Sequence, residues 1–120
     1  MRLRSDIFVS ALVRRIFAEG GFAAIEKKGA AEAGAIAIRQ TLRDGSENLF
    51  LPALQSADNA EIADRVFERR MRDADALSVS DRLEKERRFD GDLWIVGVEI
   101  ETMGDIIAVL PEDHNWRARL

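Results

Sequence analysis

The chain has 120 residues, of which 47% are hydrophobic and 33% are charged, with a net charge of −4 and no cysteine. This length and balance predict a single domain, residues 1–120, that buries one core. The lack of cysteine excludes disulfides and thiolate metal sites, and the negative charge argues against general nucleic-acid binding.

The first predicted element is an amphipathic helix that begins at Ser5. Ser5 is a good N-cap, and Asp6 just inside it favours the positive end of the helix dipole. Gly20-Gly21 ends the helix, because glycine adopts the left-handed conformation without penalty. The segment is not a signal peptide, since Arg14 and Arg15 interrupt its apolar residues. At about 100° per residue, the side chains expected on its buried face are Phe8, Val9, Leu12, Val13, Ile16 and Phe17.

A meander of short strands is expected next. Residues 29–34 are bracketed by glycines and predict a loop rather than a helical turn. Asp44-Gly45 suits a tight hairpin turn, and Pro52 ends the strand that returns from it. The strands predicted here span residues 22–28, 35–42 and 47–51.

Residues 52–61 predict a surface connection, and residues 64–71 fit two patterns. In a helix, Val66 and Phe67 would share an apolar face that also contains Arg70. In a strand, the charged and apolar residues would distribute over both faces, and we favour the strand.

A second helix is predicted from Ser78 to about Arg88. Ser78 can cap it with Asp81 at the third position, a capping box in which Asp replaces the usual Glu. The side chains expected to face inward are Val79, Leu83 and Phe89.

Residues 88–101 hold the most hydrophobic run of the chain. Leu93 to Gly97 carry no charge, as expected of a strand buried on both faces, with Trp94 in the core. Residues 106–110 form a last apolar run, closed by Pro111. In the polar tail, residues 112–120, Trp116 is either an anchor or an exposed partner contact, and the tail docks through it or frays.

These elements predict a mixed α/β fold of α+β type. It has one twisted mixed sheet of about five strands, a long N-terminal helix, and a second helix before the central Trp94 strand. A parallel position of the Trp94 strand beside an earlier strand would explain why it is so continuously apolar.

Several motifs follow one another in a specific order: Ser5-Asp6 with residues 9–15, then residues 20–23, 28–35 and 88–94. This order resembles a small bacterial family known only as a domain of unknown function, number 1491. The resemblance covers nearly the whole chain and implies an α/β fold, with no activity or catalytic residue to carry over. Two positions depart from the family pattern: Gly91 stands where proline is expected, and residues 51–55 are less polar and less proline-rich.

Four carboxylates around the Trp94 strand are the first candidate site. Asp90, Asp92, Glu99 and Glu101 could bind a divalent cation or divide acid and base roles. Strand geometry puts Asp92 and Glu99 roughly 23 Å apart, so they form two separate groups. The interpretation we favour is that they keep the strand ends in water and oppose edge pairing.

Residues 27–34 are the second candidate, because amides beside glycines and lysines can cradle an anion. The segment lacks the P-loop signature, and a plain connecting loop is favoured. The arginine clusters are interleaved with glutamates, as in a predicted Glu84–Arg88 pair, so a self-paired surface is favoured. His114 is the only histidine and cannot alone supply a metal site.

The leading hypothesis is a cytoplasmic, non-enzymatic module that binds a protein or small ligand, with a homo-oligomer as one possibility. It would need no cofactor, metal, membrane or nucleic acid, and no segment reaches the roughly 20 apolar residues of a membrane helix. The alternative is an enzyme or anion-binding domain for a phosphorylated or carboxylated metabolite, using Lys28, an arginine of the first helix and a carboxylate of the Trp94 strand. The candidate ligand-binding residues are Arg14, Lys28, Asp90, Asp92, Glu99 and Glu101.

Overall fold

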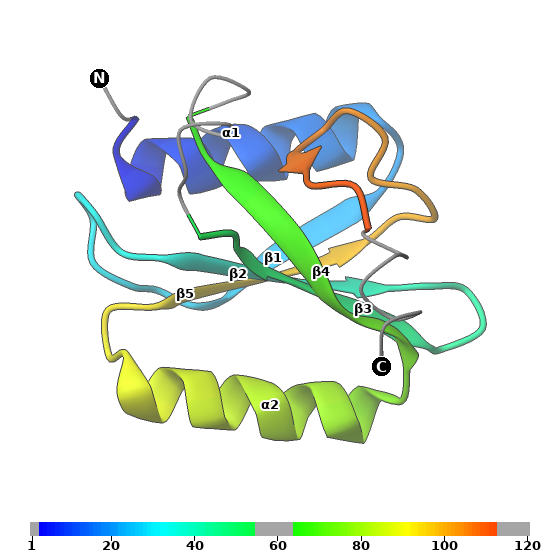
Figure 1. Ribbon diagram of the computed structural model, residues 1–120. Coiled ribbons are helices and arrows are strands. Elements are labelled where there is room, and N and C mark those ends of the chain that lie inside the picture. Colours follow the sequence, from blue (N-terminus) through cyan, green and yellow to red (C-terminus); the bar gives the residue numbers. More distant parts are fainter. Residues whose placement is uncertain (1–2, 55–63, 113–120) are drawn as a thin grey trace.

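A computed structural model of the protein describes residues 3–54 and 64–112 (Figure 1). The predicted mixed fold is confirmed, with six strands in the described part of the chain rather than about five, because a two-residue strand forms at Ala108–Val109. Within the described residues, no helix is both long and apolar enough to cross a membrane. The elements are α1 (Ser5–Ala18), β1 (Phe22–Lys27), β2 (Ile36–Thr41), β3 (Glu47–Pro52), β4 (Val66–Ala74), α2 (Ala76–Phe89), β5 (Trp94–Glu99) and β6 (Ala108–Val109).

The sheet has the order β1-β5-β2-β3-β4-β6 and lies between the two helices. Figure 1 shows α1 above the sheet and α2 below it. Each helix buries its own apolar cluster against one sheet face, so the sheet carries a core on both sides. The α1 side includes Val9, Ile16, Ile38, Phe50, Phe67 and Val96, and the α2 side includes Ala37, Leu49, Leu51, Val79, Leu83 and Ile95.

Strand β5 runs antiparallel to β1 and parallel to β2, with Trp94 opposite Ile36 and Glu99 opposite Thr41. The predicted parallel position is therefore confirmed. It explains the uncharged run, because helices cover both faces of the strand. Trp94 is 2% exposed, as predicted for a core residue.

Helix α1 differs from its prediction at both ends. Arg4 is the N-cap residue and Ser5 is the first helical residue. The prediction that Ser5 caps the helix is wrong, because its hydroxyl donates to the Gly34 carbonyl at 2.6 Å. Phe17 was predicted to be buried but is 50% exposed, since it packs at the sheet edge against Phe22, with the rings at 82°.

Helix α2 begins earlier than predicted, at Ala76. Asp75 caps it by accepting a hydrogen bond from the Ser78 amide at 2.7 Å, so the prediction that Ser78 is the cap is wrong. Phe89 was predicted to face inward but is 93% exposed. At about 100° per residue it lies well outside the stripe that Val79 and Leu83 define.

The other predicted elements hold. The ambiguous segment forms strand β4, and the hairpin turn, with Gly45 at φ 88°, joins β2 to β3. Residues 55–63 of the predicted connection, and the tail with His114 and Trp116, lie outside the described residues.

Candidate ligand-binding cleft

An open cleft of about 470 Å³ lies where three segments of the chain end together. Strands β2 and β5 are parallel, so their carboxyl ends reach the same edge of the sheet, and the turn from α1 to β1 closes the third side. The lining residues are Glu19, Gly20, Gly21, Thr41, Leu42, Arg43, Glu99, Ile100, Glu101 and Thr102.

Two close contacts hold these walls together. A Cβ on Gly21 would lie 2.7 Å from the Glu99 carbonyl oxygen, so only glycine lets the turn approach the end of β5 this closely. The Gln40 side chain donates to the Ile100 carbonyl at 2.7 Å, and the Asn48 amide donates to Gln40 at 2.9 Å. Gln40 and Asn48 are buried, so this amide chain fixes the β5 wall against the hairpin.

The cleft carries three carboxylates and one guanidinium. Glu19 pairs with Arg15 at 3.2 Å, and Glu101 accepts a hydrogen bond from the Arg43 amide at 2.9 Å. Glu99 is exposed and makes no ion pair with another described residue. The excess of negative charge suits a positively charged guest group.

The described residues offer no cluster of metal-binding side chains. There, no group of three or more histidine, aspartate or glutamate side chains could hold a metal ion.

The six candidate residues from the sequence do not form one site. Glu99 and Glu101 lie together in the cleft. Asp90 and Asp92 share a turn before β5, where Asp90 accepts from the Asp92 amide at 3.0 Å, at the opposite end of that strand. The remaining two, Arg14 on α1 and Lys28 after β1, are exposed on other elements.

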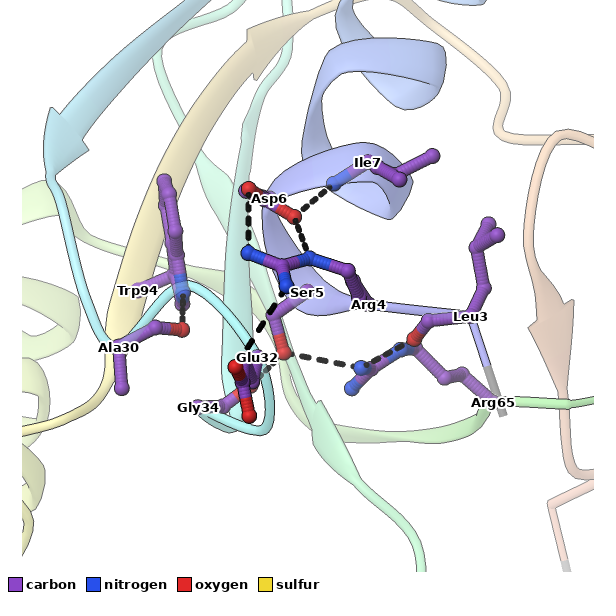
Figure 2. Close-up of polar contacts among 10 residues, drawn as sticks. All are labelled: Leu3, Arg4, Ser5, Asp6, Ile7, Ala30, Glu32, Gly34, Arg65 and Trp94. Atoms are coloured by element: carbon purple, nitrogen blue, oxygen red, sulfur yellow. Dashed lines mark hydrogen bonds and ion pairs between the residues drawn. The ribbon is translucent and has the colours of Figure 1, made fainter. Parts of the chain in front are cut away.

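The loop between β1 and β2, which contains the glycine-bracketed residues 29–34, anchors helix α1 (Figure 2). The carbonyls of Ala31 and Glu32 accept the first two amides of α1, at 3.0 and 3.2 Å. The Ala30 carbonyl accepts the Trp94 indole N–H at 2.8 Å. Because carbonyl oxygens fill the helix N-terminus, where an anion would bind, the loop has a structural role in this conformation.

Arg65 is a buried arginine that the sequence reasoning did not single out. It is 6% exposed and donates to the Leu3 carbonyl at 3.0 Å and to the Ser5 hydroxyl at 2.9 Å, as Figure 2 shows. Its guanidinium also lies 5.4 Å from the centre of the Phe8 ring. Arg65 therefore ties the start of α1 to β4, and its only sequence signal is its place just before an apolar strand.

A second buried network lies on the α2 side of the sheet, beside the cleft. Arg39 donates to Glu47 at 2.6 and 3.1 Å and to the Ser80 hydroxyl at 2.9 Å. Burial opposes the charge of Arg39, but the hydrogen bonds and charges of Glu47 and Glu26 together outweigh burial and raise the pKa of Arg39. No local sequence pattern predicts this network, because its partners come from different elements.

The surface arginines are largely paired, as predicted. Arg69 and Arg72 both contact Glu112, at 2.6 and 2.8 Å. In α2 the predicted pair of Glu84 with Arg88 does not form, and Glu84 instead faces Arg87 at 4.0 Å.

The family model described as a protein of unknown function, DUF1491, matches residues 3–108. The chain belongs to the DUF1491 family. The resemblance seen in its motifs is therefore confirmed, and the family carries no assigned function. No match was found among curated proteins.

Three solved structures are similar to this chain in sequence and fold. Protein Atu0922 from A. tumefaciens, solved in solution, is 52% identical with a TM-score of 0.83, covering 94% of this chain and 98% of that one. A crystal structure of a DUF1491 family protein from Caulobacter crescentus is 29% identical with a TM-score of 0.76, covering 92% and 100%. An NMR structure of a DUF1491 family protein from Caulobacter crescentus is 30% identical with a TM-score of 0.75, covering 92% and 99%.

Proposed function

We propose that this DUF1491 protein is a non-enzymatic binding module whose cleft takes a positively charged group of a protein or small ligand. The observation that carries the proposal is the excess of carboxylates around an open cleft at the carboxyl ends of β2 and β5. Ligands of open α/β sheets commonly bind outside the carboxyl ends of the strands. A cytoplasmic location is part of the proposal, supported by a sequence without cysteine.

Glu99 is the carboxylate best placed to receive the guest. Glu19 and Glu101 already accept hydrogen bonds from other groups, whereas Glu99 has no ion-pair partner among the described residues. A guest ammonium or guanidinium would gain a charge-assisted hydrogen bond there, and its apolar part would lie near Leu42 and Ile100.

The alternative, an enzyme or anion-binding domain, is not favoured by the geometry. It needs Lys28, an arginine of α1 and a carboxylate of the Trp94 strand at one place. Lys28 follows the end of β1, whereas Glu99 lies opposite Phe22 at its start. The loop that would cradle an anion uses its carbonyls to hold α1.

The test is a nitrogen-15 NMR titration with N-acetyl-arginine amide and agmatine, and with uncharged N-acetyl-citrulline amide as the reference ligand. We expect both cations to shift the amide signals of residues 19–21, 41–43 and 99–102 and no others. The uncharged reference ligand should shift none of them. Glu99→Gln should weaken binding about five-fold, in keeping with one exposed ion pair. Glu84→Gln removes an equal charge from α2 and should have no effect.

Two results would count against the proposal. The first is an absence of cleft shifts with both cations. The second is an equal loss of affinity in Glu99→Gln and Glu84→Gln, which would indicate general attraction to an acidic protein.

A further inference from the structure

Strand β1 is an edge of the sheet. It pairs with β5 on one side, and no described residue pairs with it on the other. Along that open side, alternate residues present unpaired N–H and C=O groups, which an added strand would satisfy. The first four residues, Phe22 to Ile25, are uncharged and in regular register with β5, and a bulge follows between Ile25 and Lys27.

Apolar side chains gather beside this open edge. Phe17, Phe22 and Ile25 are 50%, 51% and 48% exposed, and we call them the edge patch. The rings of Phe17 and Phe22 pack edge to face with centres 5.5 Å apart, so their exposed surfaces are held together. The edge patch therefore flanks the open backbone, with Phe22 and Ile25 on alternate faces of β1, and an added strand would cover apolar side chains as well as backbone groups.

The charges at the two ends of β1 are complementary to each other. At its start, Phe22 lies opposite Glu99, and Glu19 lies in the preceding turn. After its end, Lys28 is exposed and has no ion-pair partner among the described residues. The neighbouring Lys27 is already engaged, since its ammonium donates to the Gly91 and Leu93 carbonyls at 2.8 Å.

An identical strand that pairs antiparallel would match these ends. With Ala24 or Ile25 on a two-fold axis, the segment that follows the bulge, including Lys28, runs toward the Gly20–Phe22 end of the other copy. Either register directs Lys28 toward the acidic cleft of the other copy, and the regularly paired residues 22–25 carry no charge. A parallel pairing would instead bring like-charged ends together, which is unfavourable.

We propose that β1 of a second copy of this chain pairs antiparallel with β1 of the first. Lys28 of each copy then lies at the Glu99 side of the other copy's cleft. The inference rests on the proposed function, because it names Lys28 of the second copy as the cation that the cleft takes. The bulge limits regular pairing to residues 22–25, so the association is weak and depends on protein concentration.

The first test uses the absence of cysteine from the chain. Residues directly opposite in an antiparallel pair have Cα atoms about 4.5–5.5 Å apart, a distance that a disulfide spans. Ala24→Cys or Ile25→Cys should therefore form a disulfide-linked dimer under mild oxidation. Glu84→Cys, on α2, is the matched exposed control. Cross-linking no faster than in this control would overturn the proposal.

The second test is sedimentation equilibrium with reversed charges. Lys28→Glu and Glu99→Lys should each weaken association about five-fold, and the double variant should restore it. All of these side chains are exposed, and circular dichroism verifies the fold of each variant. Failure of the double variant to recover association would refute the role of Lys28.

A third measurement separates the two proposals. Lys28→Glu should still bind agmatine, because its own cleft is intact. Agmatine binding that depends on Glu99, without cross-linking at β1, would overturn the dimer and leave the proposed function standing. Cross-linking with charge rescue but without agmatine binding would support the dimer and refute a cleft for small cations.

Discussion

Removal of the Glu47 carboxylate should destabilise the protein more than any surface substitution. The side chains of Arg39 and Glu47 are 15% and 7% exposed, and two hydrogen bonds join them. Glu47 also accepts from the Thr41 hydroxyl at 2.9 Å. Glu47→Ala leaves the Arg39 guanidinium largely buried, with Glu26 at 3.4 Å as its remaining ion-pair partner among the described residues.

The expected loss in the free energy of unfolding is about 3 kcal/mol, the range for one partner removed from a buried ion pair. The double variant Arg39→Met with Glu47→Leu should remain within about 1 kcal/mol of the parent, because it removes both charges and fills the space. Comparing the single and double variants therefore tests whether Arg39 and Glu47 depend on each other, rather than the simple loss of a side chain.

Urea unfolding followed by circular dichroism measures both changes, with Glu84→Ala as the exposed control, expected within about 0.5 kcal/mol of the parent. A loss below about 1 kcal/mol for Glu47→Ala would show that water screens the pair. A double variant no more stable than Glu47→Ala would refute the coupling.

Two further predictions concern packing and pH. Gly21→Ala should lower the unfolding free energy by about 1–3 kcal/mol, because the new Cβ meets backbone of β5. Gly91→Ala meets no atom within 4 Å and should be neutral or stabilising by up to about 1 kcal/mol. Hydrogen bonds from the Ser78 amide and hydroxyl hold the pKa of Asp75 below its ordinary value of 3.8. This stabilisation is present above pH 3.8 and is lost as the pH falls through the pKa of the folded protein. Between neutral pH and pH 3, the thermal unfolding midpoint of Asp75→Asn should therefore fall less than that of the parent protein. An equal fall in the unfolding midpoint of Asp75→Asn and of the parent protein would contradict the role of Asp75 as the cap of α2.

Local patterns in the sequence specify most of the elements. The apolar spacing of α1, Asp44-Gly45 in the hairpin and the uncharged run from Leu93 to Gly97 each depend on neighbouring residues alone. These signals were enough to place the helices and long strands and to predict the mixed sheet. They were weakest at helix ends, where Ser5 and Ser78 both fit a cap and the structure uses other residues.

The tertiary structure decided how the polar groups are used. Ser5 is a helix cap by sequence, but Gly34 and Arg65, distant in the chain, engage its hydroxyl. Strand spacing divides the four carboxylates around β5 into two groups, but only the fold shows that one group, Glu99 and Glu101, lines a cleft.

The sequence by itself determined the elements, the buried β5 strand and the membership of a family, because these depend on local periodicity and on motif order. The cleft depended on strand pairing, since residues 19–21, 41–43 and 99–102 meet only when β2 and β5 lie parallel. The Arg39 and Arg65 networks likewise join elements far apart in the chain. Hydrogen bonds and ion pairs act over a few ångströms in space, so only the folded chain decides which charges meet.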